Sequence, residues 1–204
     1  MRLQIVQAGE EVLRTRAREL SREEILSDKT RELIEHMKET LRHAPGVGLA
    51  APQVGISEQL AVIEDREEYH KKLTATQLAE RQRKPVPFHV IINPRIVLSD
   101  DASVEFFEGC LSVAGYSAIV PRARSVTVEY LDELAETKRV YAIGWYARIL
   151  QHEIDHLAGV LYVDHMHART WTTLDNLERL WKDRSASEVL ARLSSGLDSN
   201  ACRL

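Results

Sequence analysis

One apolar helix late in the chain constrains the fold more than any other segment. Residues 145–157 contain no proline or glycine, and Gly144 and Gly159 stand on either side of the run. Apolar side chains fall on nearly all faces of a helix built from these residues, which is typical of a helix buried at the centre of a domain. The strand-like segments must then cover it, so we predict an α+β fold with small mixed or antiparallel sheets around a buried central helix.

The same helix carries His152 and His156, four residues apart, with Glu153 directly after the first histidine. Positions four apart lie above one another on one helix face, so the two imidazoles can bind one metal ion from one side. Glu153 then reaches a water at that ion without being a ligand, which is the arrangement of a hydrolytic metal site. Alternatively, the two histidines are ordinary core residues whose ring nitrogens are satisfied by hydrogen bonds. The glutamate between them favours metal binding over this alternative.

The rest of the chain indicates one domain with an extension. A chain of 204 residues can bury one sizeable core. We expect a single catalytic domain over residues 1–170 and a C-terminal helical extension over residues 171–204, whose tail from residue 194 is a candidate for disorder. Alternation and turn residues predict strands at 59–64, 88–93, 95–98, 104–107, 125–131, 138–142 and 160–163.

Two segments between these elements contrast in polarity. Residues 65–87 are dense in charge, and we interpret them as a solvated surface segment with a helical turn at 76–83. Residues 46–53, Gly-Val-Gly-Leu-Ala-Ala-Pro-Gln, are small and uncharged. Because glycine lets a backbone approach a ligand closely, this segment is either a tight connection or a loop beside a bound molecule.

The charge and hydropathy of the chain give no indication of nucleic acid or a membrane as a binding partner. A net charge of −4 gives no signature of nucleic-acid or anionic-membrane binding, and no apolar run approaches the length of a membrane span. Residues 1–11 include acidic side chains and lack the apolar stretch of a signal peptide. We therefore expect a cytoplasmic protein or the mature form of an organellar one.

The two histidines need a third protein ligand, for which the cysteines are candidates. Cys110 and Cys202 are far apart and do not suggest a disulfide framework, and in a reducing compartment a thiolate can bind metal. Cys110 directly follows a predicted strand and is the better placed of the two, although a plain buried cysteine is the alternative. Three protein ligands leave the fourth tetrahedral position open for water.

Three segments together resemble the signature motifs of the peptide deformylase family. They are Gly46-Val-Gly-Leu-Ala-Ala-Pro-Gln53, Glu108-Gly-Cys-Leu-Ser112 and Gln151-His-Glu-Ile-Asp-His156, in the family's order and at similar spacing. The similarity covers residues 1–170, and parts of it look closer to the organellar branch. The resemblance implies removal of the formyl group from the N-terminal formyl-methionine of nascent polypeptides, with release of formate. The implied partners are those N-termini and, transiently, the ribosome.

The resemblance also implies which residues form the metal centre. The ligands would be Cys110, His152 and His156, with Glu153 as the general base. The cofactor would be one divalent metal ion. A Cys/His/His set suits Fe(II), Zn, Ni or Co, and the resemblance implies Fe(II) in the cell.

Further residues are implied for catalysis and substrate binding. The side chain of Gln53 and the backbone N–H of Leu111 would stabilise the oxyanion. One departure is Ser117, which stands where many bacterial members have an arginine, so a substrate contact through that arginine is in doubt. The residues expected to contact the substrate are Val47, Gly48, Glu108, Gly109, Trp145 and Ile149.

Two other interpretations of the histidine pair stay open. A metalloprotease would need a third metal ligand downstream of the two histidines. Gly159 fits the extended protease pattern, but Tyr162 stands where the last histidine of that pattern belongs. The other common third ligand is a glutamate about twenty residues further on, and by spacing alone Glu178 could fill that role. A structural metal site would need four protein ligands, for which His165 and His167 are close in sequence.

Overall fold

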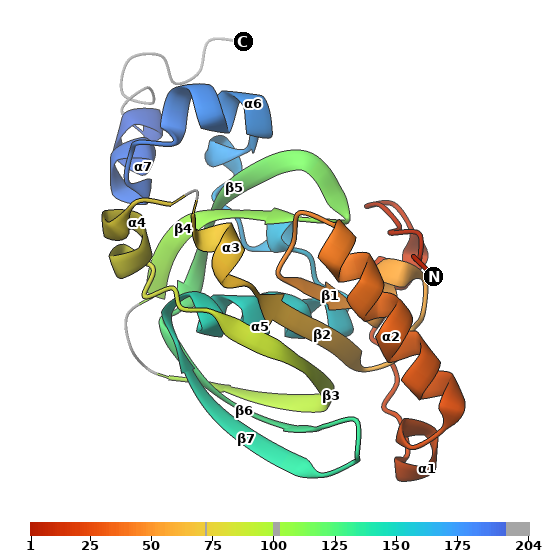
Figure 1. Cartoon of the computed structure of the whole chain (residues 1–204). Coiled ribbons are helices and arrows are strands. Elements are labelled where there is room, and N and C mark those ends of the chain that lie inside the picture. Colours follow the sequence, from red (N-terminus) through yellow and green to blue (C-terminus); the bar gives the residue numbers. More distant parts are fainter. Residues whose placement is uncertain (72, 100–102, 195–204) are drawn as a thin grey trace.

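The computed structural model describes residues 1–71, 73–99 and 103–194, in which two antiparallel sheets pack around one helix (Figure 1). The first sheet has the strand order β1-β2-β3-β6-β7, and the second has the order β4-β5-β8. The predicted α+β class with antiparallel sheets is confirmed. The strands are β1 (Gly48–Ala50), β2 (Leu60–Asp65), β3 (Val86–Leu98), β4 (Ser103–Cys110), β5 (Val113–Ala123), β6 (Ser125–Leu131), β7 (Thr137–Ile143) and β8 (Thr172–Thr173). The α-helices are α1 (Arg22–Ile25), α2 (Asp28–His43), α3 (Glu67–His70), α4 (Ala75–Glu80), α5 (Gly144–Leu157), α6 (Leu174–Asn176) and α7 (Ala186–Ser194).

Helix α5 lies between the two sheets and contacts strands of both (Figure 1). Towards the first sheet, Ala147 and Leu150 join a buried cluster with Ala61 and Ile63 of β2. Towards the second sheet, the Arg148 guanidinium donates a hydrogen bond to the carbonyl oxygen of Val120 in β5 at 3.0 Å. The helix is thus fixed from two sides, which determines where its functional side chains point.

Strand β2 explains how the first sheet is covered on both faces. Leu60 and Val62 belong to the buried cluster that includes Met37 of α2. Ala61 and Ile63, whose side chains alternate with them, belong to the cluster that includes α5. Because successive side chains of a strand point to opposite faces, a strand covered on both faces reads as an uninterrupted apolar run.

Strand β3 is one strand where the sequence predicted two. The Asn93-Pro94 step does not end it; instead, the register with β6 shifts between Ile92 and Arg95. Asn93 adopts a φ of +49°, and its side chain both accepts from the backbone N–H of Leu20 at 3.0 Å and donates to its carbonyl at 2.8 Å. The predicted break is therefore a bulge that ties β3 to the N-terminal segment.

Two further expectations about strands differ from the structure. The strand predicted at 160–163 is wrong: a 3₁₀ turn forms at Tyr162–Asp164 instead, and the side chain of Asp164 accepts a hydrogen bond from the backbone N–H of Leu161 at 2.9 Å. Strand β5 was not predicted, and β1 lies within the segment interpreted as a connection or loop.

The C-terminal extension begins as part of the second sheet. Strand β8 pairs with β5, and only afterwards do α6, a π-helical turn (Leu177–Trp181) and α7 follow. Just before α7, the hydroxyl of Ser185 accepts a hydrogen bond from the backbone N–H of Glu188 at 3.3 Å. The tail from residue 194 was the candidate for disorder; Ser194 ends α7, and residues 195–204 lie outside the described residues. None of the helices in the described ranges has the length and hydropathy of a transmembrane span.

Candidate metal centre

Helix α5 and the β4–β5 hairpin bring three potential ligands together. His152 and His156 lie one turn apart, with ring centroids separated by 4.9 Å. Cys110 ends β4 at a shift in the register with β5, and its Sγ lies 3.2 Å from Nε2 of His156. One ligand atom from each of the three residues lies within 4.8 Å of the other two.

These donors fit a divalent metal ion. A thiolate and two imidazoles suit Fe(II), Zn, Co and Ni alike, and within the described ranges this is the one cluster of three such side chains. Beside it, Oε2 of Glu153 is buried and has no hydrogen-bond partner among the described residues. The arrangement therefore offers three ligands and an unengaged carboxylate oxygen in one buried place.

Glu108 supports His152 from behind. Its Oε1 lies 2.6 Å from Nδ1 of His152 and accepts from Arg122 Nη2 at 2.7 Å, while its Oε2 accepts from Arg148 Nη1 at 2.8 Å. Burial alone would raise the pKa of Glu108, but the charges and hydrogen bonds of His152 and Arg122 outweigh it and hold the pKa far below its ordinary value. A carboxylate at the second ring nitrogen orients a metal-binding histidine and increases its basicity.

Glu153 lies against the backbone of β1. A Cβ atom at Gly48 would sit 2.1 Å from Oε1 of Glu153, so a residue without a side chain is needed at that position. Burial raises the pKa of Glu153 to about 7. The close approach therefore confines the Glu153 carboxylate against β1.

Gln53 points its amide nitrogen at the cluster. Its Oε1 accepts from the backbone N–H of Ala50 at 2.9 Å, and its Nε2 lies 3.5 Å from Sγ of Cys110 and 3.3 Å from the hydroxyl of Ser112. Because the carbonyl end is held by backbone, the donor end keeps a fixed direction. Leu111, the other residue expected to stabilise the oxyanion, directly follows Cys110 and lines the same pocket as Gln53.

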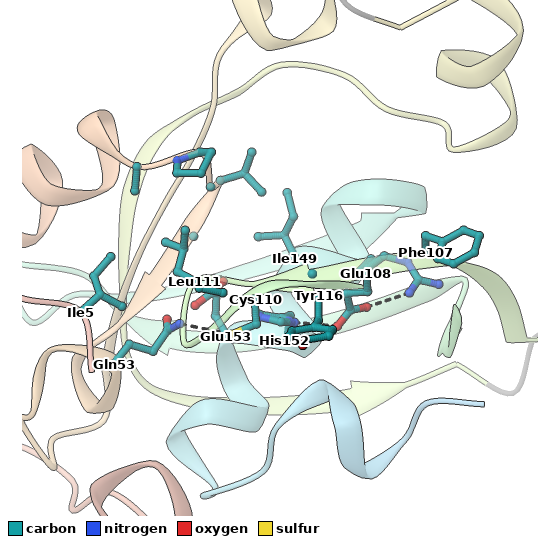
Figure 2. A pocket seen from close by; sticks show the side chains of 18 of the residues that line it. Ile5, Gln53, Phe107, Glu108, Cys110, Leu111, Tyr116, Ile149, His152 and Glu153 are labelled. Carbon is teal, nitrogen blue, oxygen red and sulfur yellow. Dashed lines mark hydrogen bonds and ion pairs between the residues drawn. The ribbon is translucent and has the colours of Figure 1, made fainter. Parts of the chain in front are cut away.

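A pocket of about 620 Å³ opens over these groups. Figure 2 shows Gln53, Cys110, His152 and Glu153 gathered along it. Every residue predicted for the site lines it except His156, which is buried and lies 3.2 Å from Sγ of Cys110. The predicted residues in its wall are Val47, Gly48, Gln53, Glu108, Gly109, Cys110, Leu111, Trp145, Ile149, His152 and Glu153.

Comparison with known sequences agrees with this geometry. The model of the family described as polypeptide deformylase matches residues 2–171. The chain belongs to the peptide deformylase family.

Individual deformylases are similar over most of the chain. Peptide deformylase 1A, chloroplastic, of Solanum lycopersicum is 45% identical over 174 residues, which make up 85% of this chain and 63% of that protein. The chain thus spans less than two thirds of that relative. Peptide deformylase 1 of Bifidobacterium longum is 44% identical over 197 residues, 96% of this chain and 87% of that protein. A class I type b peptide deformylase from Acinetobacter baumannii, in a structure described as Met-Ala-Ser bound, is 32% identical with a TM-score of 0.72 and covers 81% of this chain and 99% of its own.

The charged segment, residues 65–87, is not simply a solvated excursion as interpreted from its composition. Asp65 has a fully buried side chain and accepts hydrogen bonds from Nε and Nη2 of Arg83 at 2.8 and 2.9 Å. The guanidinium groups of Arg81 and Arg83 lie 5.1 and 5.2 Å from the ring of Trp145, and Arg83 lines the pocket. The segment therefore contributes Arg83 to the wall of the pocket.

The residues that the rival interpretations require lie elsewhere. Glu178 is 72% exposed and pairs with Lys182 at 2.8 Å. His165 and His167 are also partly exposed, and His167 pairs with Glu105 at 2.7 Å. Among the described residues, none of them joins the cluster of potential ligands.

Proposed function

We propose that the chain is a metal-dependent hydrolase that removes the formyl group from the N-terminal formyl-methionine of nascent polypeptides and releases formate. The observation that carries the proposal is the convergence of Cys110 with His152 and His156 beside an apolar pocket, with Glu153 and Gln53 facing the same place. Family membership supports the same reaction. The reaction is an amide hydrolysis.

In this proposal Cys110, His152 and His156 hold one divalent cation. When bound, such a cation acts as a Lewis acid that lowers the pKa of water and polarises a carbonyl group. We propose Fe(II) as the metal in the cell, with Zn, Ni or Co as ions found after isolation, because all four accept this donor set. Metal analysis after anaerobic and aerobic purification tests the choice: iron should be found only, or mainly, in the anaerobic sample.

Glu153 is proposed to move the proton. It takes a proton from the attacking water and later delivers it to the leaving amine. Two features support this role: one carboxylate oxygen has no partner among the described residues, and the other is confined by the backbone at Gly48. A confined carboxylate stays within reach of both the water and the amine.

Gln53 and the backbone N–H of Leu111 are proposed to stabilise the developing negative charge on the formyl oxygen. The amide of Gln53 is aimed in advance, because its carbonyl end is held by the N–H of Ala50. Donors fixed before the reaction need no reorganisation when charge appears.

Selectivity for a formyl group is proposed to follow from crowding. A Cβ at Gly46 would lie 2.9 Å from Cδ1 of Leu111, and one at Gly48 would collide with Glu153. The backbone therefore approaches the centre closely, which leaves room for a formyl hydrogen and little for a methyl group. Val47, Trp145 and Ile149 supply an apolar wall for the unbranched methionine side chain.

Two wider proposals come from the sequence. We propose that residues 1–170 are the catalytic domain, that residues 171–204 extend it, and that the protein contacts the ribosome transiently where formylated chains emerge. We also propose that it acts in the cytoplasm or, as a mature organellar enzyme, inside an organelle.

Formate release from formyl-Met-Ala-Ser, with the metal content measured in the same sample, tests the reaction. Cys110→Ser should lose both metal and formate release, whereas Glu178→Ala should keep both. Peptide-bond cleavage that depends on Glu178 and survives Cys110→Ser would instead establish a protease. N-acetyl-Met-Ala-Ser should be hydrolysed poorly, and equal rates on the acetyl and formyl peptides would refute the crowding argument.

A further inference from the structure

Three consecutive residues, Val6, Gln7 and Ala8, contact the two segments that carry the expected oxyanion donors. The backbone N–H of Val6 donates a hydrogen bond to the carbonyl oxygen of Gln53 at 2.9 Å, and the N–H of Ala8 donates to that of Ser112 at 2.8 Å. Between them, the side chain of Gln7 reaches the backbone next to Ser112. We call residues 6–8 the N-terminal brace. The brace therefore ties the segment of Gln53 to the end of the β4–β5 hairpin.

Leu111 and Ser112 form the turn that links β4 to β5, because Cys110 and Val113 pair directly before and after them. The carbonyl oxygens of both turn residues accept hydrogen bonds from the brace. From the same turn, the backbone N–H of Ser112 donates to Sγ of Cys110 at 3.4 Å. The turn is thus held between the brace and the cluster of potential metal ligands.

The side chain of Gln7 matches the groups that the turn offers. Its Nε2 donates to the carbonyl oxygen of Leu111 at 3.0 Å, and its Oε1 accepts from the backbone N–H of Ala114 at 3.2 Å. These partners lie 104 and 107 residues away in the chain. A side-chain amide has both an acceptor oxygen and an NH₂ donor, whereas a carboxylate only accepts. The pair of contacts therefore requires the amide and not merely a polar side chain of this length.

The brace lies where a shift of the turn would affect the reaction. Gln7 lines the same pocket as Gln53 and Leu111, and Figure 2 shows Gln53 and Leu111 at one end of it together with Ile5. The side chain of Gln53 is already held by the backbone N–H of Ala50. The N–H of Leu111 has the direction that the turn gives it, so contacts that fix the turn also fix this donor. Donors of an oxyanion hole act only when they are aimed in advance at the position of the developing charge.

We propose that Gln7 is a positioning residue, which holds the turn so that the N–H of Leu111 keeps its direction relative to the amide of Gln53. The proposal rests on the deformylase function and on the oxyanion donors proposed above. Gln7 acts through the backbone of Leu111 and not through a contact with the substrate.

The test compares Gln7→Ala with unaltered, metal-loaded enzyme acting on formyl-Met-Ala-Ser. A loosened donor costs less than the ~100-fold that a full displacement of about 1 Å can cost, so kcat should fall roughly three- to thirtyfold. KM should change by less than about twofold, because the interaction forms only in the transition state. A higher KM with an unchanged kcat would mean that Gln7 binds the substrate, which would overturn the positioning role.

Two further variants isolate the contact with Leu111. Gln4→Ala is the matched control, because Gln4 is an exposed glutamine of the same segment whose side chain has no hydrogen bond among the described residues; it should leave kcat and KM unchanged. Gln7→Glu keeps the size of the side chain and an acceptor for the N–H of Ala114, but it places a second oxygen against the carbonyl oxygen of Leu111. Its kcat should fall as in Gln7→Ala, and a kcat equal to that of the unaltered enzyme would overturn the proposal.

Hydrogen exchange of the same metal-loaded samples without substrate tests the brace independently of turnover. In Gln7→Ala the backbone amides of residues 111–114 should exchange roughly two- to tenfold faster, as expected when a hydrogen bond that holds a turn is lost, while the rest of the chain keeps its rates. Unchanged exchange at residues 111–114, or faster exchange throughout the chain, would overturn the positioning role. Absence of formate release by the unaltered metal-loaded enzyme would instead overturn the proposed function, whatever the exchange of the turn.

Discussion

Replacing Glu108 with glutamine exchanges one carboxylate oxygen for an NH2 group in the hydrogen-bond network that joins Glu108 to His152, Arg122 and Arg148. The carboxylate accepts from His152 and Arg122 through Oε1 and from Arg148 through Oε2. Whichever oxygen becomes an amide nitrogen, it will face an N–H donor of a buried side chain. The substitution also removes the negative charge next to two guanidinium groups whose side chains are only 5% and 3% exposed.

The substitution should lower both the stability of the fold and the affinity for the metal ion. Removing one partner of a buried ion pair typically destabilises a protein by about 3–5 kcal/mol, which lowers the melting temperature of a domain of this size by roughly 6–20 °C. Removing the carboxylate that orients a ligating histidine typically lowers metal affinity about 10- to 100-fold. Glu108→Gln should therefore show both a lower melting temperature and weaker metal binding.

Two measurements separate these effects. Thermal melts of chelator-stripped protein report the network alone, and competition with a chelator for Zn or Co reports metal affinity. Glu105→Gln is the matched control, because it makes the same change on the same strand in a side chain that is 34% exposed and pairs with the exposed His167. Metal affinity of Glu108→Gln that matches that of Glu105→Gln would refute the argument that Glu108 tunes the centre.

Three further changes have defined outcomes. Gly48→Ala places a Cβ 2.1 Å from Oε1 of Glu153; because a displacement of about 1 Å can cost ~100-fold in rate, kcat should fall by that order while metal content, measured in parallel, stays constant. Gln53→Ala should lower kcat by about 10²–10³-fold, and near-normal turnover would contradict the oxyanion assignment. The hydrogen bonds from Arg42 hold the pKa of Glu64 below its ordinary value of 4.5, so this pair stabilises the fold above that pH and loses its effect as pH falls through the lowered native pKa. When the free energy of unfolding is measured against pH, Glu64→Gln should therefore have a weaker dependence on pH than the unaltered protein below roughly pH 5. The difference should be at most about 1 kcal/mol, because Arg42 is partly exposed. An unchanged slope of the free energy of unfolding against pH would contradict this.

The sequence predicted elements whose signal is local. The apolar run around His152 indicated the helix, and Asn93-Pro94 indicated a turn that proved to be a bulge in one strand. The expected strand at 160–163 failed because its apolar side chains are also compatible with the tight turn that Asp164 stabilises. Strand β8 has only two residues, too few to show a period, so its pairing with β5 could not be predicted.

The site was predictable where residue chemistry alone identifies a role. Cys110 was chosen because a two-histidine site needs another ligand, and the structure places it against His156. Composition misled the interpretation of the charged segment, because charge density does not reveal that Asp65 and Arg83, 18 residues apart, pair in the interior. The contact between Trp171 and Tyr116 was missed for a similar reason, because only the fold brings the two rings together.

The potential ligands come from two elements that are distant in the chain: Cys110 from the β4–β5 hairpin, and His152 and His156 from α5. A cation held by all three would act as a cross-link between the second sheet and the helix, and loosening either element would release it. Ligand binding to the native state raises stability by about 2.7 kcal/mol at a free concentration 100 times the Kd. The lifetime of the polypeptide, and not only its turnover, should therefore follow the metal supply of its compartment, and starvation for the ion should expose the chain to proteolysis.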